Sequence, residues 1–168
     1  MRVSWPSLLE EIGACEKCKL HEKRTQVVPG EGNPRADLLL IGEGPGRDED
    51  RLGRPFVGAA GQLLEKMLAA ISLTRDDVYI ANVVKCRPPG NRTPEADEVS
   101  ACLPYLRLQT ALIQPKIILL MCSFAVRCDL GDEMRITRAR GQWTPRQSVG
   151  FMPKFHPARA PTDTGTNR

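Results

Sequence analysis

Residues 37–46 read DLLLIGEGPG, a short apolar run that leads directly into a glycine-rich turn. An apolar run of this length that ends in glycine predicts a strand buried on both faces. Similar runs occur at residues 78–84, 116–121 and 149–153, with helical patterns between the first three runs. Strands that alternate with helices predict an α/β fold, a three-layer α/β/α sandwich around a central four-stranded parallel sheet.

Three segments have apolar residues at helical spacing. The first covers residues 5–19 and runs into a pair of cysteines, and the second covers residues 61–68. The third opens near residue 93, where Thr93 is the expected N-cap because Pro94 suits the first helical position. In parallel sheets, ligands bind beyond the carboxyl ends of the strands, so the loops that follow the strands are expected to hold the site.

The composition favours one globular domain. The chain has 168 residues, of which 41% are hydrophobic and 26% are charged. No apolar run approaches the roughly 20 residues that span a bilayer. The first residues also lack the apolar stretch of a secretory signal. We therefore expect a cytoplasmic protein without a membrane partner. Its net charge of +4 is a weak indication of a polyanionic partner.

Six cysteines in a cytosolic chain indicate metal binding more than disulfides. Four of them combine a C-x-x-C pair with two distant thiols, a pattern that suits a four-coordinate centre. These four are Cys15, Cys18, Cys86 and Cys102. Their spacing alone leaves zinc and an iron–sulfur cluster as equal alternatives. Cys122 and Cys128 are expected to be small buried hydrophobic residues.

Several polar and aromatic residues lie where the strands are expected to end. The turn at residues 42–46 lets a backbone approach a ligand closely, although it is neither a Walker loop nor a dinucleotide fingerprint. The charged run at residues 47–51 is typical of a solvated face. Phe56 lies in a polar loop and can present a flat ring to a base. Asn82 interrupts an apolar strand and either braces a loop or reads the edge of a base. His156 follows the last strand on the same rim.

Together these motifs closely resemble family 4 uracil-DNA glycosylases, which are iron–sulfur enzymes of DNA repair. The matching strings lie at residues 15–18, 28–32, 42–46, 53–58, 61–64, 82–92 and 155–157. The resemblance implies an enzyme that flips uracil out of single- or double-stranded DNA, hydrolyses its N-glycosidic bond and leaves an abasic site. It also implies a monomer with a structural 4Fe-4S cluster on the four cysteines named above, and no catalytic metal.

The resemblance assigns base recognition to four residues. The amide of Asn82 would accept from N3 and donate to O4 of uracil, which excludes cytosine. Phe56 would stack on the flipped ring. Glu43 and Gly44 would line the pocket, with Glu43 crowding the position where thymine carries its methyl group.

The resemblance also implies how the bond is broken. His156 and backbone amides would meet uracil O2, where negative charge accumulates. Glu49 would stabilise the cation-like sugar or orient the attacking water, with Asp48 and Asp50 as neighbouring carboxylates.

The end of the chain departs from the family pattern. We expect a glycosylase domain over residues 1–157 and a divergent, flexible tail over residues 158–168. Relatives carry leucines after the His-Pro motif that wedge into the duplex, whereas residues 158–161 read ARAP. Two alternatives follow. One is a catalytically impaired DNA-binding relative, favoured by the tail. The other is a structural or redox iron–sulfur or zinc module, favoured if the pocket residues prove to be scattered.

Overall fold

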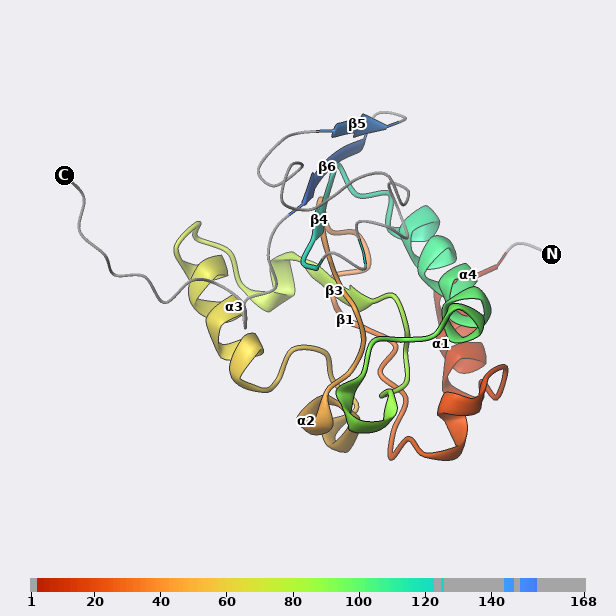
Figure 1. Cartoon of the computed structure of the whole chain (residues 1–168). Coiled ribbons are helices and arrows are strands. Elements are labelled where there is room, and N and C mark those ends of the chain that lie inside the picture. The colour runs from red at the N-terminus through yellow and green to blue at the C-terminus, as the bar shows by residue number, and fades with distance from the viewer. Residues whose placement is uncertain (1–2, 123–124, 126–143, 147–148, 154–168) are drawn as a thin grey trace.

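The computed structural model describes residues 3–122, 125, 144–146 and 149–153 (Figure 1). The helices are α1 (Trp5–Gly13), α2 (Arg47–Leu52), α3 (Ala59–Ala69) and α4 (Ala96–Ile113), with short 3-10 helices η1 (Lys19–Glu22), η2 (Arg75–Asp77) and η3 (Pro89–Asn91). The strands are β1 (Glu31–Gly32), β2 (Leu38–Gly42), β3 (Tyr79–Asn82), β4 (Ile117–Leu120), β5 (Thr144–Arg146) and β6 (Val149–Pro153). No helix in these ranges has the length and apolar character to cross a membrane. Cys128, His156 and the predicted tail at residues 158–168 lie outside the described residues.

The sheet has the strand order β1-β3-β2-β4-β6-β5. Its four inner strands, β3, β2, β4 and β6, pair in parallel, which confirms the predicted four-stranded parallel sheet. Antiparallel β1 and β5 extend the two edges. The sequence pattern did not predict these edge strands, because strands of two or three residues are too short to show a period.

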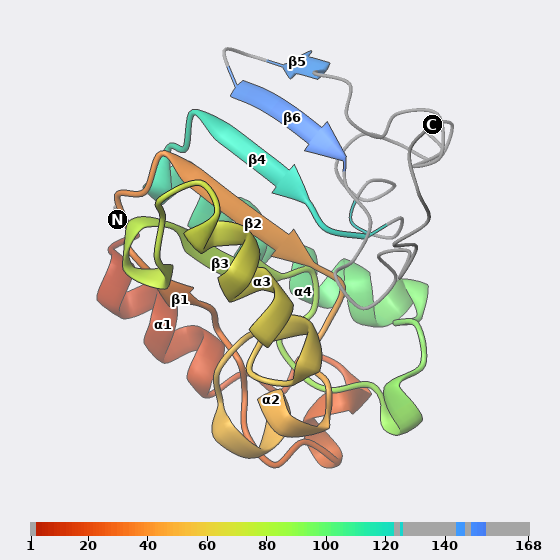
Figure 2. The same cartoon turned by 90° about the vertical axis from the view of Figure 1, so that its left-hand side faces the viewer.

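Helices cover both faces of this sheet, as Figure 2 shows for α3 in front of it and α1 and α4 behind. Alternate residues of a strand point to opposite faces. Leu39 and Ile41 pack with α1 and α4, whereas Leu40 packs with α3. The chain moves from β2 to β3 through α3 and then back past β2 to β4 through α4. Right-handed crossovers in opposite directions place the two helices on opposite faces, so the predicted α/β/α sandwich is confirmed.

The three predicted helices have different bounds in the structure. Helix α3 covers Ala59–Ala69 rather than residues 61–68. Helix α1 ends at Gly13, well before Lys19, because glycine disfavours the helical state by about 1 kcal/mol relative to alanine. The prediction that Thr93 caps α4 is wrong. The N-cap is Glu95, whose backbone N–H donates to the Glu98 carboxylate at 2.7 Å.

The charged run after the glycine-rich turn forms helix α2, which the sequence pattern did not predict. Its start is stabilised by Glu49, whose carboxylate accepts the backbone N–H of Gly46 at 3.1 Å. Acidic side chains in a first turn also interact favourably with the partial positive charge at a helix N-terminus. A six-residue helix made mostly of charged residues carries no apolar period, so its signal lies in this cap alone.

Candidate functional site

An open cleft of about 840 Å³ lies at the carboxyl ends of β2 and β3. Five of the predicted pocket residues line it: Glu43, Gly44, Glu49, Phe56 and Asn82. Cys122, which follows β4 and is buried as predicted, lines the same cleft. The structure therefore brings together residues that lie up to 79 positions apart, from the ends of three neighbouring parallel strands.

The amide of Asn82 and the ring of Phe56 meet over Gly42. The parallel register pairs Gly42 with Asn82, a residue that is only 2% exposed. A Cβ atom at position 42 would collide with Asn82 Oδ1 and would lie 2.8 Å from the Phe56 ring. Only glycine leaves room for both side chains. Sequence reasoning gave Gly42 no role in this pocket, although its place at the end of the apolar run was the available signal.

The glycine-rich turn is held beside the segment that follows β3. Beyond the paired strands, Val83 N–H donates to the Gly42 carbonyl at 3.0 Å and Val84 N–H donates to the Glu43 carbonyl at 3.1 Å. A Cβ atom at Gly44 would lie 2.7 Å from Val84 Cγ2. The backbone at Glu43 and Gly44 therefore lies against the end of β3, and its position in the cleft is fixed.

Glu49 joins the two loops that border the cleft. Its carboxylate accepts backbone N–H groups from Gly46 at 3.1 Å, Val57 at 2.9 Å and Gly58 at 3.0 Å. A carboxylate offers about four acceptor positions, so most of this group is already engaged.

The two carboxylates beside Glu49 differ in position. Asp48 lines the cleft with a side chain that is 43% exposed. Asp50 is buried and accepts the Thr25 N–H at 2.9 Å, which places it outside the cleft lining.

The loop that carries Phe56 is clamped by Arg75. Phe56 has a left-handed φ of 52°, a conformation that bulky residues rarely adopt. Its carbonyl accepts from Arg75 Nη1 at 2.9 Å, and the Pro55 carbonyl accepts from Arg75 Nη2. Arg75 is itself held by Glu31 at 3.2 Å. Sequence reasoning missed Arg75, because no motif connects it with a loop 19 residues away.

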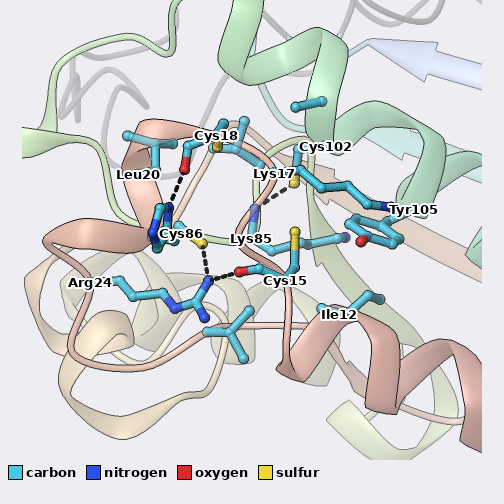
Figure 3. Close-up of a pocket in the computed structure, with 14 residues that line it drawn as sticks. Ile12, Cys15, Lys17, Cys18, Leu20, Arg24, Lys85, Cys86, Cys102 and Tyr105 are labelled. Carbon is cyan, nitrogen blue, oxygen red and sulfur yellow. Dashed lines mark hydrogen bonds between the residues drawn. The ribbon is translucent and has the colours of Figure 1, made fainter.

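The four predicted metal-binding cysteines line a second, small and largely apolar enclosure (Figure 3). They come from the segment after α1, the segment after β3, and α4. The set is Cys15, Cys18, Cys86 and Cys102. Arg24 Nη1 donates to Cys86 Sγ at 3.3 Å and to the Cys15 carbonyl at 2.7 Å, and the Lys85 backbone N–H donates to Cys102 Sγ at 3.2 Å.

Ion pairs connect the segment that carries Cys15 and Cys18 to the start of α4. Lys19, next to Cys18, pairs with Glu95 and lies 3.8 Å from Asp97. These contacts place the C-x-x-C segment at the start of the helix that carries Cys102.

Burial in the enclosure favours the protonated form of three of these thiols. Burial raises the pKa of Cys102 to about 11 and also raises the pKa of Cys18 and Cys86. As free thiols these groups would stay protonated at neutral pH, whereas a bound metal ion would convert them to thiolates. Among the described His, Cys, Asp and Glu side chains, no three converge as the ligands of a single metal ion would.

Comparison with known protein families identifies the class of DNA-repair protein to which this fold and cleft belong. The profile of the uracil DNA glycosylase superfamily matches residues 29–168, and the chain belongs to this superfamily. It is 46% identical over 166 residues to a type-4 uracil-DNA glycosylase of Sulfurisphaera tokodaii, covering 94% of this chain and 76% of that protein. A type-4 uracil-DNA glycosylase of Thermotoga maritima is 44% identical over 153 residues, or 89% of this chain and 79% of the relative. A type-4 uracil-DNA glycosylase of Archaeoglobus fulgidus is 52% identical over 124 residues, which cover 74% of this chain and 62% of that protein.

Proposed function

We propose that the protein removes uracil from DNA by hydrolysing the N-glycosidic bond, which leaves an abasic site. The observation that carries this proposal is the meeting of the Asn82 amide and the Phe56 ring over Gly42, where both side chains line a cleft large enough for a base. Membership of the uracil DNA glycosylase superfamily supports it. The pocket residues are gathered rather than scattered, which argues against a purely structural or redox module.

Base selection is assigned to Asn82. Its amide presents one donor and one acceptor, which complement O4 and N3–H of uracil and oppose the pattern of cytosine. Phe56 would stack on the base, and Glu43 with Gly44 would border its C5 side. Because Asn82 is buried at the end of a strand, its amide is held in place before the base arrives, which favours selective binding.

The cleavage step develops negative charge on the base and positive charge on the sugar. His156 is proposed to meet the developing oxyanion at O2, where a fixed donor is most effective. Glu49 is proposed to act on the sugar side through the acceptor capacity left after its three backbone hydrogen bonds. Asp48 adds an exposed carboxylate on the same wall of the cleft.

The cysteine site is proposed to hold a 4Fe-4S cluster with a structural role. Four thiols line one enclosure, as the four-thiolate ligation of a 4Fe-4S cluster needs, and the resemblance to iron–sulfur glycosylases favours the cluster over a zinc ion. The N–H donors of Arg24 and Lys85 toward sulfur are the partners that cluster thiolates require.

DNA is proposed to approach across the arginine-bearing rim of the cleft. Arg47, Arg87 and Arg92 line it, and the Arg47 side chain is largely exposed. Cationic side chains at such a rim hold phosphates and orient the strand without reading its sequence. A monomeric, cytoplasmic state stays a prediction.

Uracil release from oligonucleotides tests this proposal. We expect abasic-site formation with single-stranded uracil substrates and with loosely stacked U·G pairs, and slower release from U·A pairs. The physical reason is that extrusion from a duplex costs a few kcal/mol, which apolar wedge residues offset and residues 158–161 lack. The measurement is alkaline strand cleavage under single-turnover conditions. Equal rates on single strands and U·A duplex would show that another segment supplies the wedge, and binding without release on any substrate would indicate the impaired relative.

Loosening the Phe56 loop is expected to weaken this activity. Arg75→Met removes two charged hydrogen bonds to the loop carbonyls, and such bonds contribute about 1.5–3 kcal/mol each. We expect kcat/KM for uracil release to fall about tenfold. Arg54→Met is the control, because Arg54 pairs with the same Glu31 at 2.7 Å and its guanidinium does not bind the loop carbonyls. Arg54 lies in the same loop, so equal losses in both variants would show that tethering the loop to Glu31, rather than the hydrogen bonds from Arg75 to its carbonyls, matters.

A further inference from the structure

Lys85 lies in the interior between the cleft and the cysteine enclosure. The residue is 1% exposed, and its long side chain is among the largest that the fold buries completely. Its Nζ donates to the Asn82 carbonyl at 2.9 Å and to Gln109 Oε1 at 2.7 Å. Its backbone N–H donates to Cys102 Sγ, and its side chain lines the cysteine enclosure (Figure 3). One residue therefore contacts the strand end that presents Asn82 and the thiol set.

The Lys85 ammonium has no carboxylate partner among the described residues. Its two side-chain acceptors are a backbone carbonyl and a side-chain amide, and no ion pair of the described part of the chain includes it. A fully buried cation of this kind is strongly unfavourable unless negative charge lies close by. Cys102 accepts the Lys85 backbone N–H and is the thiol that acts electrostatically on the Lys85 side chain, so the thiolates that form when a metal cluster binds can supply such charge.

We propose that Lys85 is the buried counter-charge of the cysteine-held cluster and that the same side chain positions Asn82 for uracil recognition. The second part of this inference, the positioning of Asn82 for uracil recognition, rests on the proposed function. A cluster held by four thiolates carries net negative charge, which the ammonium stabilises. The hydrogen bond from Nζ to the Asn82 carbonyl then ties the end of β3 to the cysteine site.

Arg24 offers a matched comparison within the same enclosure. It is also cationic and donates directly to Cys86 Sγ, but its hydrogen bonds go to the cysteine segments and not to Asn82. Arg24 therefore shares the electrostatic role of Lys85 without the positioning role. Gln109 provides a second handle, because its Oε1 is the other acceptor of the Lys85 ammonium.

The experiment compares Lys85→Met, Arg24→Met and Gln109→Glu in the cluster-loaded protein. The readouts are iron content, the reduction potential of the cluster, kcat and KM for uracil release from a single strand, and hydrogen exchange of backbone amides over residues 80–84. Lys85→Met is expected to lower the potential, to lower kcat about tenfold or more with a smaller change in KM, and to speed amide exchange. Arg24→Met is expected to lower the potential and to leave kcat within about twofold. Gln109→Glu places a carboxylate beside the ammonium and draws it away from Asn82. This variant is expected to change the reduction potential and the amide exchange, but less than Lys85→Met does.

Several outcomes would overturn the inference. An unchanged potential in Lys85→Met would remove the counter-charge role, as would purified wild-type protein that contains no iron. Equal losses of kcat in Lys85→Met and Arg24→Met would remove the specific link to Asn82. If Lys85→Met does not fold, Gln109→Glu is the variant that tests the proposal. An unchanged reduction potential or unchanged amide exchange in Gln109→Glu refutes it. Failure of the wild-type chain to release uracil would refute the proposed function alone, since the potential and the amide exchange need no substrate.

Discussion

The Asn82→Asp variant is expected to release uracil about 100-fold more slowly than the unmodified chain, a barrier increase of about 2.7 kcal/mol. A carboxylate has almost the same shape as the amide but cannot donate to uracil O4. Because position 82 is buried, water cannot replace the missing donor. The negative charge would also oppose the charge that develops on the departing base. The rate of abasic-site formation under single-turnover conditions measures this effect.

Asn91→Asp is the matched control for this substitution. Asn91 lines the same cleft, but its Oδ1 accepts from Arg87 Nε at 2.7 Å, a role that a carboxylate can also fill. We expect its single-turnover rate at saturating enzyme to change by less than about threefold, because Asn91 is exposed and is not proposed to contact the base, whereas any weaker hold of Arg87 on phosphate would appear in binding. Unchanged release by Asn82→Asp, or an equal loss in Asn91→Asp, would remove Asn82 from base recognition.

The Cys102→Ala variant is expected to lose its iron and most of its folded population. Cys102 is 7% exposed on α4, within the core that joins this helix to α1 and the sheet. Binding at a structural metal site contributes on the order of 10 kcal/mol, as much as the whole stability of a typical domain. Purified wild-type protein should contain about four iron and four sulfide per chain, as a cubane cluster requires. Iron analysis and thermal unfolding followed by circular dichroism measure the loss.

Cys122→Ala controls for the removal of a buried thiol. Cys122 is 8% exposed and its Sγ accepts the Ala125 N–H at 3.2 Å, just as Cys102 Sγ accepts the Lys85 N–H at 3.2 Å. The two residues differ in that only Cys102 lines the cysteine enclosure. We expect Cys122→Ala to keep its iron and to lose about 1 kcal/mol of stability. A folded, colourless wild-type protein that contains one zinc ion would contradict the cluster assignment.

The four strands of the parallel core were predictable because each is an almost continuous apolar run. Residues 38–42 are buried on both faces, and burial of this kind leaves a composition that can be read without neighbours. The motifs also placed Glu43, Phe56 and Asn82 near one another before the fold was known. They could be located because parallel strands bring their carboxyl ends to one edge. The bounds of α1 and α4 were less predictable, because caps such as Glu95 with Glu98 depend on local hydrogen bonds.

The sequence by itself determined the fold class, the four cysteines of the second enclosure and the residues that border the cleft. The fold class follows from local composition, the cysteine set from spacing along the chain, and the cleft residues from the resemblance of the motifs to a known family. Only the tertiary structure decided the roles of Gly42, Arg75 and Lys85. Gly42 makes room for a residue on the neighbouring strand, Arg75 holds a loop 19 residues away, and Lys85 binds Gln109 across 24 residues. Contacts of this kind are set by how strands and helices pack, and a single sequence carries no local period or composition that reports them.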